Sequence, residues 1–180
     1  MIKQLIIASI LIFTGAQGSQ AQKADVDKNT IIRSLTPMEY LPQHKGTARA
    51  IDLDIEFRTG SVNLTSRAKR QLNIVSEALR DPKLAAERFQ IVGHTDASGR
   101  AAMNMALSIR RARAVFDYLI HKGGIHKDRL VSSGKGETRL KNPMAPNSGE
   151  NRRVEFILLL SDQDKANRGK KSGTEKVIKW

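Results

Sequence analysis

One stretch, residues 93–111, constrains the fold of this 180-residue chain more than any other. It begins where a short apolar run (residues 89–92) ends, passes through a polar loop that contains Asp96 and Gly99, and continues as a helical pattern. A strand, a loop and a helix in this order place the loop at the carboxyl end of the strand, where open α/β sheets bind their ligands. The loop is therefore the first candidate for a binding site.

The helix after this loop can be divided into faces by its periodicity. At about 100° per residue, its apolar residues form one stripe, which we expect to face the core: Met105, Ile109, Ala112, Phe116 and Leu119. Asn104, Ser108 and Arg111 follow one flank of the stripe, on the side that the Asp96 loop can cover. Arg110 falls on the other flank. The pattern therefore predicts that Arg111, and not Arg110, faces Asp96.

The other patterns predict an α/β (α+β) two-layer sandwich. Residues 51–57 alternate apolar and charged side chains, as in a strand with one buried face. Thr65 or Ser66 can cap a helix that ends before Pro82, and the helix of the central stretch ends at two glycines. Residues 129–133 and 153–160 are further strands, and the last is apolar at nearly every position, which favours a central place. The order β-α-β-α-β-β packs two main helices on one face of a small mixed sheet.

Residues 1–21 are typical of a secretory signal peptide. A positive residue, Lys3, precedes the apolar residues 5–13, and the cleavage site is expected after Ala21 or after Gly18. An uncleaved membrane anchor is disfavoured because the apolar run has about nine residues, whereas a span needs about 20. The chain has no cysteine, so neither a disulfide nor a lipid attached to cysteine is expected.

The rest of the chain divides into three parts. Residues 22–50 are polar and contain two prolines, so we predict a linker with at most one short ordered turn. Residues 51–161 form the predicted domain. Residues 162–180 are basic and lack periodicity, which predicts a disordered tail; its apolar end, including Trp180, has no assigned role.

The formal net charge of +13 favours an anionic partner. Nucleic acid has this property, and so does a cell-wall polymer that carries carboxylates; export would exclude nucleic acid. Enzyme signatures are missing, since the sequence has no cysteine nucleophile and neither a G-x-S-x-G nor an H-E-x-x-H motif. The other histidines have no ligand spacing that would join His94 and Asp96 in a metal site. We therefore expect no catalysis, no cofactor and no metal, and a local hydrogen bond for His94.

Five short motifs in the chain follow one another in a fixed order: Gly93-His94-Thr95-Asp96, Gly99, Asn104 with Leu107-Ser108, Arg111-Ala112, and Asn151-Arg152-Arg153-Val154-Glu155. Together they resemble the OmpA-like peptidoglycan-binding domain, the type found at the C-terminus of OmpA and MotB, over about residues 50–160. The resemblance implies non-covalent binding of peptidoglycan through the diaminopimelate of its stem peptides. It also implies a periplasmic, wall-associated protein, with the inner face of the outer membrane as one expected place.

The free end of diaminopimelate carries an ammonium and a carboxylate on one carbon, so it needs an anion and a cationic fork a few ångströms apart. Asp96 can accept the ammonium, and Arg111 can bind the carboxylate through two parallel N–H bonds. The resemblance assigns the same roles to these two residues. It further implies that Asn104 hydrogen-bonds the peptide and that Arg152 lines the site.

Two alternatives and two further expectations remain at this point. From spacing alone, Asp96 could equally cap the helix and form a structural ion pair with Arg111. Arg110 and Arg153 are expected to be solvated surface charges. An enzyme that acts on cell-wall peptides is the second functional hypothesis, and another envelope protein is a further expected partner through the linker or the tail.

Overall fold

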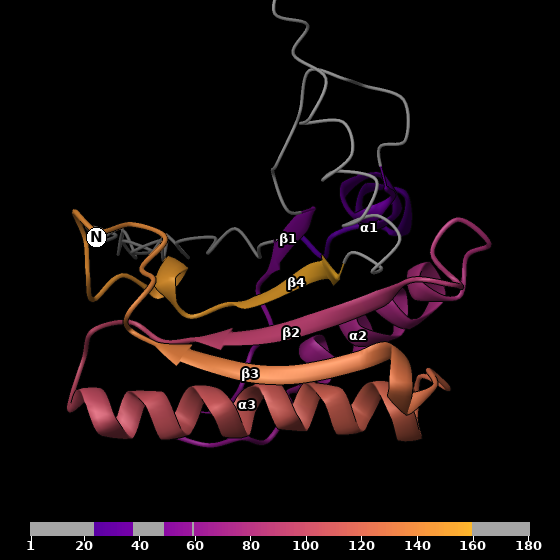
Figure 1. Cartoon of the computed structure of the whole chain (residues 1–180). Helices are drawn as coiled ribbons and strands as arrows, with labels where there is room; N and C mark the ends of the chain where they lie inside the picture. The colour runs from indigo at the N-terminus through magenta and orange to yellow at the C-terminus, as the bar shows by residue number, and fades with distance from the viewer. Residues whose placement is uncertain (1–23, 38–48, 59, 160–180) are drawn as a thin grey trace, which may run out of the picture.

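The computed structural model describes residues 24–37, 49–58 and 60–159. Four strands form one mixed sheet in the order β1-β4-β2-β3. In it, β2 is parallel to β3, and β4 is antiparallel to both β1 and β2. The predicted element order and the central place of the last strand are confirmed (Figure 1). The bounds are α1 (Lys28–Leu35), β1 (Ala50–Leu53), α2 (Ser66–Leu79), β2 (Arg88–His94), α3 (Ala101–His121), β3 (Leu130–Gly136) and β4 (Val154–Leu159), with 3-10 turns at Lys127–Arg129 and Gly149–Asn151.

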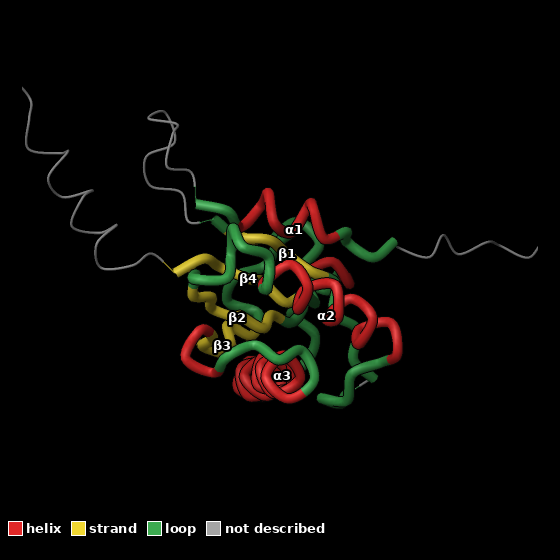
Figure 2. The backbone as a smooth tube through the Cα atoms, turned by 90° about the vertical axis from the view of Figure 1, so that its right-hand side faces the viewer, coloured by secondary structure: helices red, strands yellow, loops and turns green. Residues whose placement is uncertain are grey.

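The core lies between the sheet and the two long helices, α2 and α3, which cover the same face (Figure 2). Alternate residues of β2 and β4 point into it, which is the period of two that a half-buried sheet requires. The α/β sandwich predicted from the sequence is thus the observed architecture. The buried side chains include Phe89, Ile91, Val154, Phe156 and Leu158 from the strands, and Leu72, Val75, Leu79, Ala112, Val115 and Leu119 from the helices.

The first strand is shorter than its alternating pattern predicts. β1 ends at Leu53, because the amide of Ile55 turns back to donate a hydrogen bond to the carbonyl of Leu53 at 3.1 Å. The next residues leave the sheet, and Phe57 pairs only with Leu64 in an isolated antiparallel bridge. This turn carries the aromatic ring of Phe57 away from the sheet ladder and toward α3.

The predicted linker over residues 22–50 contains a helix. Residues 28–35 form α1, which begins at the N-cap Asp27 and buries Ile31, Ile32 and Leu35 in the core. Eight residues are too few for a helix that is stable alone, so α1 depends on its contacts with α2 and β1. Residues 38–48 of the predicted linker, the predicted signal peptide and the predicted tail lie outside the described residues.

The backbone next to α1 is also fixed to the domain. The side chain of Gln71 on α2 accepts a hydrogen bond from the Val26 amide at 2.6 Å and donates one to the Val26 carbonyl at 2.9 Å. At the other end of α1, the Arg49 guanidinium donates to the carbonyls of Arg33 and Ser34, which a helix C-terminus leaves unsatisfied. The segment therefore belongs to the folded domain.

Glycines bring α3 unusually close to the sheet. A Cβ atom on Gly93 of β2 would lie 2.3 Å from the carbonyl oxygen of Ser108, and one on Gly134 of β3 would lie 2.3 Å from the Ser108 hydroxyl. Gly136 has a φ of 51°, and a Cβ atom there would lie 2.9 Å from the amide nitrogen of Met105. No side chain fits between these backbones, so the N-terminal half of α3 packs directly on β2 and β3.

This close packing corrects the predicted orientation of α3. The buried residues of its first half are the polar Asn104, Ser108 and Arg111, whereas Ile109 is 48% exposed and Met105 is only partly buried. Ala112 and Leu119 are buried as predicted. The helix is thus turned so that the predicted flank, not the predicted stripe, faces the sheet. Within the described residues, no helix is long and apolar enough to cross a membrane.

The burial of α1 predicts a measurable contribution to stability. Leu35 is fully buried, so Leu35→Ala should lower the free energy of unfolding by about 2–4 kcal/mol in denaturant titration. Asn29→Ala, at an exposed position of the same helix, is the matched control and should change it by about 0.5 kcal/mol or less. Equal effects of the two substitutions would show that α1 does not pack on the domain in solution.

Candidate ligand-binding site

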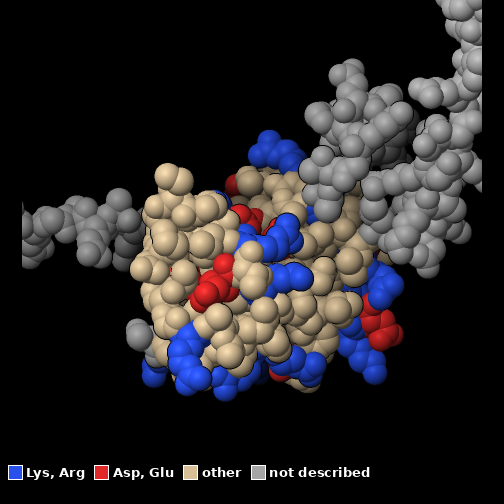
Figure 3. All heavy atoms as spheres, turned by 60° about the vertical axis from the view of Figure 1, so that its left-hand side comes forward, with Lys and Arg blue, Asp and Glu red and all other residues tan. Residues whose placement is uncertain are grey.

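A pocket of about 340 Å³ opens where β1, β2 and β4 meet the N-terminal half of α3. Its walls carry both signs of charge, and Figure 3 shows basic and acidic side chains side by side on this end of the molecule. The pocket is lined by Asp54, Ile55, Glu56, Phe57, His94, Arg111, Gly149, Glu150, Arg152, Arg153 and Val154. Two of the four predicted site residues, Arg111 and Arg152, are therefore in its wall.

Arg111 projects from the inner face of α3 and is 9% exposed. Its Nε donates to the carbonyl of Ser61 at 3.2 Å, and its guanidinium carbon lies 4.9 Å from the centre of the Phe57 ring. Among the described residues, no carboxylate lies within 4.0 Å of it, and its two terminal nitrogens have no hydrogen-bond acceptor. The loop at residues 57–64 thus fixes one edge and one face of the guanidinium and leaves the forked edge available.

The surroundings of Arg111 disfavour its positive charge. Burial is the main cause that lowers the pKa of the guanidinium, the neighbouring Arg152 lowers it further, and Asp96 acts in the opposite direction. A buried cation without a bonded anion is destabilising. A ligand carboxylate at this edge would relieve both the desolvation and the repulsion from Arg152.

Asp96 lies in the loop after β2 and is 8% exposed. One of its carboxylate oxygens accepts a hydrogen bond from Nη1 of Arg152 at 2.6 Å, and the other accepts one from the Ser98 amide at 3.2 Å. The two contacts of the structural alternative for Asp96, a cap on α3 and an ion pair with Arg111, are not found among the described residues. The N-cap of α3 is Arg100, without a side-chain cap, and the ion pair that Asp96 forms within the described residues is with Arg152, not Arg111.

Asn104 holds the Asp96 loop in place. Its amide nitrogen donates to the carbonyls of Asp96 (3.3 Å) and Ser98 (3.0 Å) and to the carboxylate of Glu137 (2.6 Å). Those contacts use its N–H groups, so a hydrogen bond to a bound peptide would have to come from its side-chain oxygen. These contacts make Asn104 a positioning residue for the Asp96 loop.

His94 ends β2 with its side chain fully buried, and its Nε2 lies 3.1 Å from a carboxylate oxygen of Glu155 on β4. The hydrogen bond of His94 is thus made to the neighbouring strand β4 and not, as predicted, locally within the loop that follows β2. Among the described residues, Nδ1 has no partner, and no group of three metal-ligating side chains is found. Burial, followed by the charge of Arg153, lowers the pKa of His94 from its ordinary value of 6.5, although Glu155 opposes this shift.

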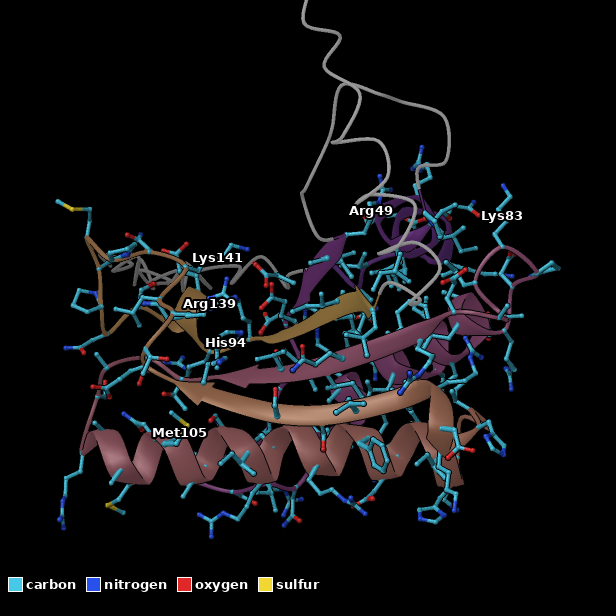
Figure 4. All side chains as sticks on the ribbon, in the orientation of Figure 1. Arg49, Lys83, His94, Met105, Arg139 and Lys141 are labelled. Carbon is cyan, nitrogen blue, oxygen red and sulfur yellow. The ribbon has the colours of Figure 1, made fainter. Side chains whose placement is uncertain are left out.

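Arg153 differs from the prediction of a solvated charge. Its side chain is only 11% exposed, and its Nε donates to Asp52 of β1 at 2.9 Å. Lys141 binds the same carboxylate at 3.0 Å, and together the two cations lower the pKa of Asp52 against the effect of burial. Figure 4 shows Lys141 and Arg139 on the side of the sheet opposite α3. Arg153 thus joins β4, β1 and the loop before β4, while Arg110 is exposed as predicted.

The residues that orient Arg111 were not predicted. Ser61 acts through its backbone carbonyl, so its side chain gives no signal, and Phe57 looks like the last core residue of an alternating strand. Glu137, the acceptor for Asn104, follows Gly134-Lys135-Gly136 and is not among the predicted site residues. The one signal in the sequence for these contacts is a charged residue, Arg111, on the flank of a helix that is expected to be buried.

The sequence profile of the OmpA family matches residues 56–154, more than half of the chain. The chain belongs to the OmpA family. It is 34% identical over 132 residues to outer membrane protein A of Bordetella avium, across 68% of this chain and 65% of that protein. It is 44% identical over 100 residues to outer membrane protein A of Escherichia coli O157:H7, across 54% of this chain and 27% of that protein. The chain spans less than two thirds of the length of these relatives.

Solved structures of OmpA-family domains have the same fold. A MotB-like protein of Desulfovibrio vulgaris is 29% identical, with a TM-score of 0.51 over 61% of this chain and 71% of that one. The periplasmic domain of Helicobacter pylori MotB is 17% identical, with a TM-score of 0.58 over 72% of this chain and 87% of that one. The second likeness supports the fold alone.

The buried His94 predicts a pH effect on stability. About one pH unit or more above 6.5, His94 is neutral in both the folded and the unfolded chain. Below pH 6.5 the unfolded chain takes up a proton that the folded state, with its lowered pKa, does not, so the free energy of unfolding falls as the pH falls. Between about pH 7.5 and about pH 5.5, the melting temperature of His94→Gln should therefore decrease less than that of the wild type.

His126→Gln is the matched control, because the side chain of His126 is 70% exposed. This variant should follow the pH profile of the wild type. The account of His94 would be wrong if His94→Gln lost as much melting temperature on acidification as the wild type does.

Proposed function

We propose that the domain binds peptidoglycan non-covalently, through the zwitterionic end of diaminopimelate in its stem peptides. The observation that carries this proposal is a buried guanidinium, Arg111, whose forked edge has no anionic partner among the described residues. Membership in the OmpA family supports a cell-envelope role. The proposed function is binding and not catalysis, since a fixed cation and a fixed carboxylate are sufficient to bind the zwitterion.

The carboxylate of the ligand binds to Arg111. Phe57 and the Ser61 carbonyl hold the guanidinium so that both terminal nitrogens face the same way. Two parallel N–H bonds to a carboxylate are stronger and more directional than a single contact from a lysine ammonium. The neighbouring Arg152 adds a second positive charge beside the same anion.

The ammonium of the ligand binds to Asp96. Each oxygen of this carboxylate accepts one hydrogen bond, from Arg152 and from the Ser98 amide, and the ligand ammonium takes the place of the Arg152 contact. Asn104 holds the loop that carries Asp96 at a fixed position relative to α3. Asp96 and Arg111 together therefore match a carbon that bears an ammonium and a carboxylate.

The expected site of action is the periplasm, with the protein associated with the wall. The support is the signal-like composition of residues 1–21 and the outer membrane proteins among the relatives. N-terminal sequencing of the protein from its host should find a mature chain that begins after Ala21 or after Gly18. Recovery of the chain with Met1 intact from the cytoplasm would contradict this location.

The ligand chemistry is tested by comparing sacculi that contain diaminopimelate with sacculi that contain lysine at the same position. Lysine offers an ammonium without the neighbouring carboxylate, so Arg111 stays unpaired. Hydrogen bonds to charged groups contribute about 1.5–3 kcal/mol, so sedimentation with sacculi should show a preference of about 10- to 150-fold for diaminopimelate. Arg111→Ala should abolish this preference, and Asp96→Ala should weaken binding to both walls.

Arg110→Ala is the matched control, since Arg110 is the exposed neighbour of Arg111 on the same helix. It should retain both the affinity and the preference of the wild type. Equal binding of the wild type to both walls, or an effect of Arg110→Ala as large as that of Arg111→Ala, would contradict the proposed site. Release of soluble fragments from the sacculi would instead indicate an enzyme.

A further inference from the structure

The Asp96 carboxylate is paired with a cation of the protein itself. Nη1 of Arg152 lies 2.6 Å from one Asp96 oxygen, while the Arg152 side chain is 53% exposed and that of Asp96 is 12% exposed. The pair thus joins a nearly buried anion to a cation that reaches it from the solvent side. Arg152 occupies the position that the proposed function assigns to the ammonium of the ligand.

The local backbone makes room for this arrangement. Arg152 follows the 3-10 turn at Gly149–Asn151, and a Cβ atom on Gly149 would lie 2.8 Å from Nη2 of Arg152. The guanidinium therefore lies against the bare backbone of Gly149. The turn itself is fixed by Asn151, which is fully buried and donates to the carbonyls of Ala145 and Pro146. The position of Arg152 on Asp96 is thus supported from two sides.

We infer that Arg152 is a specificity-determining residue: as the resident cation on Asp96, it excludes ligands that bring an ammonium without a carboxylate. This inference rests on the proposed function. An incoming ammonium must compete with Arg152 for Asp96. A ligand that also carries a carboxylate provides Arg152 with a new anion beside Arg111. An amine alone leaves Arg111 and the displaced Arg152 without an anion.

The charges in the site support this exchange. The charge of Arg152 disfavours the positive charge of Arg111, and among the described residues Asp96 is the carboxylate that offsets this effect on Arg111. If a ligand ammonium binds Asp96, the Asp96 carboxylate no longer offsets the repulsion between Arg111 and Arg152. A ligand carboxylate placed between them restores the balance. Discrimination therefore comes from Arg152 as well as from the direct contact with Arg111.

The test measures binding of two soluble stem tetrapeptides that differ only in their third residue, diaminopimelate or lysine, by titration calorimetry of the full chain. In Arg152→Gln the lysine peptide no longer competes with a resident cation, so its affinity should rise by about two- to fivefold, the range for a partly exposed ion pair. The diaminopimelate peptide gains access to Asp96 but loses a contact to its carboxylate. Its affinity should therefore change less, and the preference should fall.

Two further variants separate the resident cation from a general effect of charge. Gly149→Ala retains every charge but crowds Nη2 of Arg152, so it should also raise the affinity for the lysine peptide, by a smaller factor. Arg110→Gln removes one positive charge from the exposed flank of α3 and should leave both affinities unchanged. Melting temperatures of all three variants confirm that each one is folded.

The inference is overturned if Arg152→Gln leaves the affinity for the lysine peptide unchanged or lowers it. A fall of the diaminopimelate affinity alone would mean that Arg152 is only a direct contact to the ligand carboxylate. These outcomes differ from a failure of the proposed function, in which the wild type binds neither peptide.

Discussion

The close contact between α3 and the strands β2 and β3 is the constraint on which the rest of this structure depends. Gly93, Gly134 and Gly136 remove the side chains that would separate the two layers, so that the backbone around Ser108 lies directly on the sheet. Ser108 completes the contact by accepting a hydrogen bond from the Gly136 amide at 2.9 Å. This packing determines the rotation of α3 about its axis. Asn104 and Arg111 consequently lie on the buried face, where a surface helix would carry apolar residues.

A buried arginine needs a support that does not neutralise it. In this domain the support is an aromatic face and a backbone carbonyl, from Phe57 and Ser61. Both lie in the segment where the chain leaves β1, and the Phe57–Leu64 bridge closes that segment into a loop. A carboxylate in the same place would stabilise Arg111 more strongly and would also compete with any anionic ligand. The cation–π contact orients the guanidinium and leaves its charge available.

The sequence was sufficient for the order of the elements, since caps, glycines and prolines act locally. Thr65 caps α2 as predicted, and the apolar β4 is central. Features set by tertiary contacts were missed. The burial of Ile31 and Leu35 depends on a helix too short to be recognised by periodicity, and the rotation of α3 depends on glycines in two other elements. Of the predicted site, Arg111 and Arg152 line the pocket, while the contacts of Asp96 and Asn104 could not be read from spacing.

In each of two pairs of adjacent arginines, the position along the chain decides in which direction each side chain points. Arg110 and Arg111 are about 100° apart on α3, so one is exposed and the other reaches the pocket. At the start of β4, Arg152 and Arg153 point in different directions, as successive residues of an extended chain do. Arg153 joins β4 to Asp52 of β1 and is nearly buried, which fixes the backbone at this point. Because that backbone is fixed, Arg152 can reach Asp96 from a defined origin while its side chain stays half exposed. The helix α3 thus holds Arg111 in place, whereas Arg152 is held by its neighbour Arg153, whose contact with Asp52 fixes the backbone just before β4.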